Sequence, residues 1–237
     1  MISLRTGTSG YGYKEWLGRF YPEKLPASAM LRFYAQRFTT VEINNTFYRM
    51  PSPKVLEQWM SEVPDDFTFT LKAPRRITHI QRLVDCAENT TEFLRRADTL
   101  GNRLGPILFQ LPPFLKKDVA RLQSFLATLP PGKPMAFEFR HDSWHDDEVH
   151  AALANHGAML CVTDTDEGET PFATTAREGY LRLRRTHYSD DELATWAVRI
   201  SSTTGIERAW VYFMHEDEAL GTVFAEKLAA RWKALAG

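Results

Sequence analysis

Six apolar segments of this chain end in ionic or amide side chains placed on alternate residues. Carboxylates can act as general acids or bases, and a lysine can act as an electrophile or, when desolvated, as a nucleophile. Arginine suits the bidentate recognition of phosphate or carboxylate. The side chains in question are Glu42, Asn44, Lys72, Gln110, Glu138, Arg140, Asp164, Arg182 and Arg184. This pattern predicts several strand ends that converge on one polar site.

Alternation along these segments shows which face carries the charge. Successive side chains of a strand point to opposite faces, so Phe67, Phe69 and Leu71 share one face and Lys72 ends the other. The same division recurs at 105–110, 135–140 and 179–184. An antiparallel sheet with one solvated face would explain any single segment. It does not explain the set, because hairpin loops need only about 2 to 5 residues and these connections are long enough for crossover helices.

Helical periodicity and capping residues occupy several of the connections. Apolar residues fall at helical spacing around 30–38, 119–126 and 193–200, and Ser189 with Glu192 fits a capping box. Ser52 before Pro53, and Asp118, are further candidate N-caps. We therefore expect helices between most of the strands. The strands are expected near residues 4–8, 40–44, 67–72, 105–110, 135–140, 158–164, 179–184 and 208–213.

Eight strands alternating with helices predict a single compact α/β domain over residues 1–237, a (β/α)8 TIM barrel, which typically takes about 250 residues. An open doubly wound sheet is the alternative, but its strands should be apolar on both faces. Charge on one face favours the barrel. Residues 165–178 carry Gly168, Pro171 and several threonines, so we expect a missing or distorted helix after the sixth strand.

Composition sets wider limits on location and partners. With 43% hydrophobic residues, 25% charged residues and a net charge of -1, the chain is typical of a soluble globular domain. We find no leader-like basic and apolar start and no apolar run near about 20 residues, which predicts a cytoplasmic location and no membrane partner. Cys86 and Cys161 show neither metal-ligand spacing nor a disulfide framework. The oligomeric state is left open.

Six ordered motifs carry a resemblance to a known family. They are TGTSGYGYKEWLGRFYP at 6–22, VEINNTFYRMP at 41–51, LKAPRRITH at 71–79, FQLPPF at 109–114, EFRHDSW at 138–144 and YFMHED at 212–217. Together they resemble the YecE-like family of TIM-barrel proteins (domain of unknown function 72) over nearly the whole chain. The resemblance implies a barrel fold and does not supply a reaction. Family members often carry RLHG after the seventh strand, where this chain has Arg182 to Arg185, RLRR.

Four residues are candidates for catalysis. Glu42, Glu138 and Asp164 are expected to face one lumen, where one carboxyl could have its proton affinity raised and serve as a general acid while another stays ionised. Lys72 could act as an electrophile or nucleophile. The alternative is structural. Lys72 and the lumen arginines would then only pair with these carboxylates, because buried charges must be partnered.

Residues around the expected mouth are candidates for ligand binding. Aromatic rings beside cations can stack on a base or a sugar, although such rings more often anchor loops. The glycine-flanked Ser9 segment could expose backbone N–H groups to an anion. The candidate binding residues are Ser9, Tyr11, Asn44, Tyr48, Gln110, Arg140, Trp144, Arg182, Arg184 and Tyr212.

No cofactor is predicted. A divalent metal is an alternative, for which His141 and His215, each just past a strand end, would be the first ligands to test. Lys72 and Arg140 in the lumen would repel a cation and disfavour it.

Three functions fit these expectations. The leading one is an enzyme, a hydrolase or a lyase or isomerase, that acts on a small anionic ligand such as a phosphorylated sugar or nucleotide. The second is a nucleic-acid-binding or phosphodiester-processing protein, by analogy to barrels of the endonuclease-IV kind. The third is a non-catalytic ligand-binding barrel. Fold alone does not choose among them.

Overall fold

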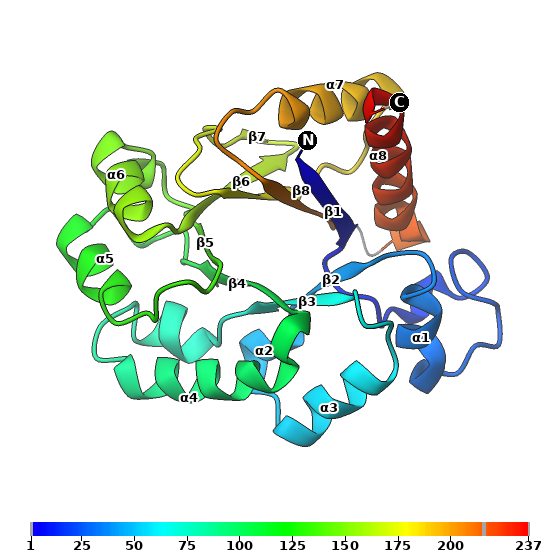
Figure 1. The fold of residues 1–237 in the computed structure, drawn as a ribbon, viewed down its shortest axis with the longest axis horizontal. Helices are drawn as coiled ribbons and strands as arrows, with labels where there is room; N and C mark the ends of the chain where they lie inside the picture. Colours follow the sequence, from blue (N-terminus) through cyan, green and yellow to red (C-terminus); the bar gives the residue numbers. More distant parts are fainter. Residues whose placement is uncertain (1, 215–216, 237) are drawn as a thin grey trace.

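Eight parallel strands form a ring at the centre of this computed structural model, which describes residues 2–214 and 217–236 (Figure 1). Their order around the ring is β1-β9-β8-β6-β5-β4-β3-β2. All eight predicted strands are present, so the predicted (β/α)8 barrel is confirmed. The strands are β1 (Ser3–Thr8), β2 (Thr40–Ile43), β3 (Thr68–Lys72), β4 (Leu104–Gln110), β5 (Met135–Glu138), β6 (Met159–Thr165), β8 (Glu178–Leu183) and β9 (Arg208–Phe213).

The ring is nearly closed, and its seam lies between β1 and β2. Ser9 and Glu42 form an isolated bridge there, at the carboxyl end of both strands. Further down the seam, the Tyr34 hydroxyl accepts a hydrogen bond from the Thr8 N–H (2.9 Å) and donates one to the Thr40 carbonyl (3.1 Å). This phenol joins the two strands where no ladder forms. Two buried backbone groups are therefore satisfied without direct strand pairing.

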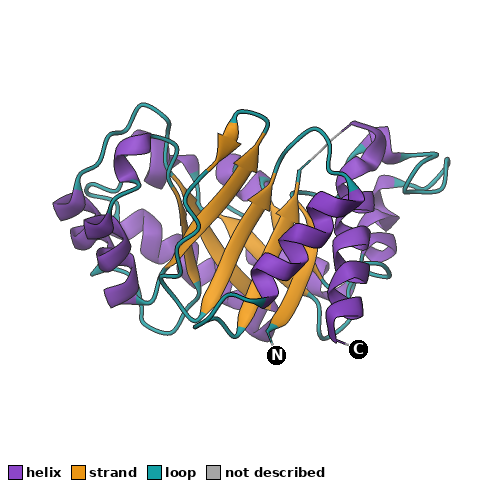
Figure 2. Cartoon of the chain, turned by 90° about the horizontal axis from the view of Figure 1, so that it is seen from above, coloured by secondary structure: helices purple, strands orange, loops and turns teal. Residues whose placement is uncertain are grey.

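Helices surround the ring, and the strands run across it from one edge to the other (Figures 1 and 2). Ser189 and Glu192 form the predicted capping box, Asp118 accepts from the Arg121 N–H, and Ser52 caps the helix that starts at Pro53. None of the described helices combines the length and apolar character needed to cross a membrane. The α-helices are α1 (Met30–Tyr34), α2 (Asn45–Tyr48), α3 (Pro53–Ser61), α4 (Ala87–Ala97), α5 (Val119–Leu126), α6 (Asp147–His156), α7 (Asp190–Ser201) and α8 (Leu220–Ala236).

The connection from β6 to β8 contains no helix, as the sequence predicts. Instead β7 (Gly168–Glu169) folds back and pairs antiparallel with the end of β6. Thr175 anchors the rest of the connection, because its hydroxyl accepts from the Leu160 N–H (2.8 Å) and donates to the Ala158 carbonyl (2.7 Å). The β6–β7 hairpin thereby stands at the carboxyl edge of the barrel.

Side chains fill the interior of the ring in layers, as expected for a small barrel. Trp210 lies low in the lumen and donates to the Glu178 carboxylate (2.6 Å). Above it the Tyr212 hydroxyl contacts those of Thr40 and Thr70, each at 2.8 Å. The charged residues form the layer nearest the carboxyl edge, which therefore lies over a packed floor.

Candidate functional site

A fully buried guanidinium joins two buried carboxylates at the top of the lumen. Arg182 is 1% exposed, and its two terminal nitrogens donate to Glu42 Oε1 (2.7 Å) and Glu138 Oε2 (2.6 Å). The three side chains come from β8, β2 and β5, which are not adjacent strands. Alternation on each strand directs them inward, so the barrel brings together three charges that are far apart in the sequence.

Neutral and charged donors occupy the remaining carboxylate oxygens. Ser9 and Tyr180 donate to Glu42 at 2.7 and 2.5 Å. Gln110 and Arg140 donate to Oε1 of Glu138 at 2.8 and 3.1 Å. Each carboxylate therefore has at least three donors, and the network is well satisfied on its acceptor side.

These contacts hold both carboxyl groups ionised. Burial by itself raises the pKa of Glu42, but Arg182, Tyr180 and Ser9 outweigh it and the pKa is lowered. Burial also acts to raise the pKa of Glu138, and there Arg182 and Arg140 prevail, so this pKa is lowered as well. Of the three carboxyls among which one was expected to have a raised proton affinity, Glu42 and Glu138 therefore do not have it. Both serve as fixed anions that orient Arg182.

Lys72 has a pKa that is lowered to near the physiological range. Its half-buried ammonium lies 4.4 Å from the centre of the Phe47 ring and makes no ion pair or hydrogen bond within 2–214 and 217–236. Burial, followed by the charge of Arg182, lowers the pKa of Lys72 from 10.5 to about 8. A substantial fraction of this amine is neutral at physiological pH.

His79 joins this cluster from the loop after β3. Its ring meets that of Phe47 edge to face at 4.9 Å, and Nδ1 lies 2.9 Å from the Thr78 hydroxyl. Burial and the nearby charges of Lys72 and Arg140 lower the pKa of His79 to about 4, so the imidazole is neutral near pH 7. Sequence reasoning passed over His79 because it does not lie on a strand. Its position in the LKAPRRITH motif was the available signal.

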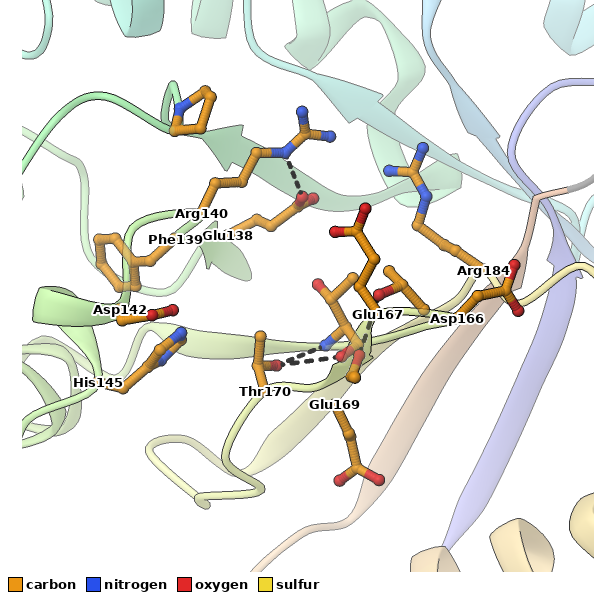
Figure 3. Close-up of a pocket in the computed structure, with 14 residues that line it drawn as sticks. Glu138, Phe139, Arg140, Asp142, His145, Asp166, Glu167, Glu169, Thr170 and Arg184 are labelled. Carbon is orange, nitrogen blue, oxygen red and sulfur yellow. Dashed lines mark hydrogen bonds and ion pairs between the residues drawn. The ribbon is translucent and has the colours of Figure 1, made fainter.

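A pocket of about 730 Å³ opens beside the buried network at the carboxyl edge (Figure 3). Glu138, Arg140 and Arg184 form part of its wall, and the β6–β7 hairpin forms another part. Arg184 is half-buried, and burial together with the neighbouring Arg182 lowers its pKa. Two of the lumen cations thus reach an accessible space.

The hairpin adds acidic groups that sequence reasoning did not select. Glu169 pairs with Arg199 (2.7 Å), and Asp166 accepts from the Thr186 N–H (3.0 Å). Glu167 is exposed and extends toward Glu138 and Arg184 (Figure 3). The pocket therefore has a cationic wall and a partly acidic rim.

Asp164 does not face the lumen, and the prediction that it does is wrong. Its pairing partner on β8 is Leu183, whereas Thr163 pairs with the inward-facing Arg182. The Asp164 carboxylate accepts from Arg185 Nε (2.7 Å) and from the Tyr188 hydroxyl (3.0 Å) on the outer side of the sheet. Through these contacts Asp164 holds the loop between β8 and α7 against the outer side of the sheet.

Two aromatic candidates are structural anchors, so their predicted contact with a ligand is wrong. Trp144 is fully buried, stacks on Phe139 at 4.7 Å and donates to the Leu115 carbonyl at 2.7 Å. Tyr212 is buried below the ionic layer with its hydroxyl occupied by two threonines.

Three other candidates lie around the mouth. Tyr48 ends α2 and is exposed, whereas Tyr11 is half-buried against Tyr34, with ring centres 6.2 Å apart. Asn44 precedes α2, and its Oδ1 is buried without a hydrogen-bond partner. Their contact with a ligand stays a prediction.

Of the two candidate metal ligands, His141 lies among the described residues. His141 Nδ1 accepts from the Ser143 N–H (3.2 Å) in a local turn, and His215 lies outside the described residues. Within 2–214 and 217–236, no group of three or more His, Cys, Asp or Glu side chains is arranged to hold a metal ion.

Comparison with known proteins places this barrel in a family. The pattern described as "Protein of unknown function DUF72" matches residues 5–236. The chain belongs to the DUF72 family. As a DUF72 protein it is 31% identical to the UPF0759 protein YunF of Bacillus subtilis over 197 residues, which cover 76% of this chain and 68% of YunF.

Other relatives agree with this family. UPF0759 protein YecE of Escherichia coli K12 is 38% identical over 141 residues, or 57% of this chain, and the chain thereby spans about half (52%) of YecE. The crystal structure of a DUF72 protein from Thermotoga maritima MSB8 superimposes with a TM-score of 0.85 at 28% identity, covering 99% of this chain and 100% of that one.

This DUF72 chain departs from the RLHG pattern after the seventh barrel strand. Arg184 lines the pocket, and Arg185 pairs with Asp164. His187 packs edge to face on Phe224 of α8 at 5.9 Å, away from the mouth. His187 therefore does not replace the family's histidine.

Proposed function

We propose that this DUF72 barrel is an enzyme that binds a small anionic substrate, such as a phosphorylated sugar or nucleotide, in the pocket at its carboxyl edge. The observation that carries the proposal is an excess of positive charge around two carboxylates that are already engaged. The cations are Lys72, Arg140, Arg182 and Arg184, and the carboxylates are Glu42 and Glu138. Two positive charges are left without a counterion in this layer.

Like charges gathered at one site repel one another, and a bound anion relieves this repulsion. Arg140 and Arg184 reach the pocket and can bind phosphate or carboxylate oxygens through paired N–H donors. Both are more exposed than the fixed Arg182, so they can adjust to a ligand. The charge pattern supports recognition of an anion of phosphate size.

Lys72 is the group we propose for chemistry. The carboxylates do not suit a general acid because their pKa values are lowered. Lys72, with a pKa of about 8, can take up or release a proton near neutral pH. We therefore revise the carboxylate acid–base scheme to one in which the carboxylates hold Arg182 and the lysine reacts.

Binding of inorganic phosphate and pyrophosphate tests the anion site. Arg184→Gln should weaken affinity by about tenfold or more, because a charge-assisted hydrogen bond contributes about 1.5–3 kcal/mol. Arg95→Gln is the matched control, since Arg95 lies on α4 in a local pair with Glu92. Titration calorimetry at low ionic strength measures both. Equal affinities in Arg184→Gln, Arg95→Gln and the unmodified protein would reject the site.

A second candidate, binding of single-stranded nucleic acid, is favoured by two exposed rings beyond the strand ends. Tyr48 is 80% exposed after β2, and Phe114 is 65% exposed after β4. Exposed rings beside cations can stack on bases. On this proposal, oligonucleotide affinity falls steeply with added salt and is weakened by Tyr48→Ala. No binding at low salt would reject it.

A further inference from the structure

We infer that Lys72 forms a covalent imine with the carbonyl carbon of an anionic aldehyde or ketone held at the mouth of the barrel. The inference rests on the proposed anion site, and it narrows the substrate class to small carbonyl compounds that carry a phosphate or carboxylate group. It depends on how the amine of Lys72 is placed.

The Lys72 amine is held without a carboxylate partner. Every carboxylate oxygen of Glu42 and Glu138 has donors from other residues, and among the described residues the Lys72 ammonium makes neither an ion pair nor a hydrogen bond. Its contact is the face of the Phe47 ring at 4.4 Å. A lysine kept only for structure would be expected to pair with one of the neighbouring anions.

Neighbouring cations favour the neutral form of the Lys72 amine. Arg182 is fixed between two carboxylates and cannot move away, and Arg140 adds a second positive charge. Together with burial, these charges outweigh the attraction of the two glutamates and bring the pKa of Lys72 to about 8. Relative to an amine of pKa 10.5, the neutral fraction near pH 7.5 rises on the order of a hundredfold.

The same cations can position the substrate. Arg140 and Arg184 border the pocket beside Glu138, whose charge also acts on Lys72. Lys72 does not itself line the pocket, and we place the carbonyl of a ligand held by these arginines beside Glu138, on the side that faces the amine. Two buried atoms, Arg182 Nε and Asn44 Oδ1, have no hydrogen-bond partner among the described residues.

The reaction is balanced without a further reactant. The amine lone pair attacks the carbonyl carbon, a C–N bond forms, and the oxygen takes a proton while the nitrogen loses one. The carbinolamine hydroxyl then takes a proton and leaves as water while the nitrogen lone pair forms the C=N bond, and the nitrogen releases its remaining proton, so that the net change is the loss of one water. Water can carry these protons, and the neutral imidazole of His79, which packs on the Phe47 ring that Lys72 also contacts, adds no further positive charge. Imine formation in turn makes the carbon next to the C=N acidic, which suits lyase or isomerase chemistry.

Reductive trapping on the intact protein tests the inference. The protein is incubated with glyoxylate, an anionic aldehyde, and cyanoborohydride, and peptide mass spectrometry locates the secondary amine that results. Lys72 should be modified about tenfold or more faster than the exposed Lys54 of α3, which serves as the internal comparison. With propionaldehyde, a neutral aldehyde, most of the rate difference between Lys72 and Lys54 should disappear. In Lys72→Arg, no modification should be found at position 72.

The outcomes separate this inference from the anion site. If phosphate binds and Arg184→Gln weakens it, but glyoxylate modifies Lys72 no faster than Lys54, the imine is rejected and the anion site stands. Selective modification of Lys72 by propionaldehyde as well would show a reactive lysine and reject the anionic substrate class. Selective modification by glyoxylate that inorganic phosphate slows supports both.

Discussion

Replacement of Arg182 by methionine should destabilise the barrel strongly. The substitution keeps much of the side-chain volume and removes the cation shared by Glu42 and Glu138, which are 0% and 2% exposed. Their distances of 2.7 and 2.6 Å to the guanidinium show that both depend on it. In this variant the Glu42 and Glu138 carboxylates face each other in the lumen, and no other cation lies as close to both of them as Arg182 does.

The expected magnitude follows from the cost of an unpaired buried charge. Loss of one partner of a buried ion pair costs about 3–5 kcal/mol in free energy of unfolding. In a domain of this size, 1 kcal/mol corresponds to about 2–4 °C, so the melting temperature should fall by about 6–20 °C. Arg37→Met is the control, because Arg37 and Glu226 form an exposed pair expected to contribute under about 1 kcal/mol.

The loss should depend on pH with a definite sign. In the unmodified protein the pKa of both carboxyls is lowered, so their stabilisation is present above about pH 4.5 and is lost as the pH falls through the folded-state values. In Arg182→Met, burial raises these pKa values, and the resulting penalty applies above about pH 4.5. The difference in stability should therefore be largest near neutral pH and should narrow as the pH falls toward about 4.5.

Urea denaturation followed by circular dichroism from neutral pH to about pH 4.5 measures this difference. Adding Glu42→Gln and Glu138→Gln to Arg182→Met removes the buried charge and should recover most of the lost stability. The assignment of Arg182 as the counterion of both carboxylates would be refuted if Arg182→Met lowers the free energy of unfolding by less than about 1 kcal/mol at neutral pH. It would also be refuted if the difference in stability between the variant and the unmodified protein grows as the pH falls.

Two further substitutions test how the barrel closes and how a helix begins. Gly7→Ala would bring a Cβ against the Thr40 carbonyl oxygen and the Tyr34 hydroxyl at the seam. We therefore expect the free energy of unfolding, measured by urea titration, to fall by about 1–3 kcal/mol. An unchanged denaturation midpoint would contradict this close approach. Ser189→Ala removes the capping box of α7 and should cost about 1 kcal/mol, which thermal unfolding detects as a shift of a few degrees. If Ser189→Thr, which keeps the hydroxyl, is equally destabilised, the cap is not the cause.

The residue pattern was sufficient for the fold because the signals are local. Alternation in 67–72 and 179–184 reports which side chains leave each face of a strand, and the Ser189 capping box depends on four consecutive residues. Weak helix formers after the sixth strand also predicted the missing helix. Each of these features depends on neighbours in the chain, which the sequence displays directly.

The misplacement of Asp164 shows where such reasoning fails. Leu160 and Val162 on one face of β6 are as apolar as Met159 and Cys161 on the other. Alternation therefore does not identify the inward face, and an error of one residue reverses it. The register with β8, which pairs Asp164 with Leu183, decides the matter.

The amino-acid order by itself determined the strands, the starts of three helices at Ser52, Asp118 and Ser189, and a set of charges of which all but one, Asp164, meet at the carboxyl edge. Only the folded ring decided which charges neutralise one another, that Glu42 and Glu138 hold Arg182, and that Lys72 is left with an aromatic ring in place of an anion. The physical reason is that pairing energies and pKa values depend on burial and on distances between residues far apart in the chain, 140 positions for Glu42 and Arg182 and 44 for Glu138 and Arg182, and tertiary structure alone sets both.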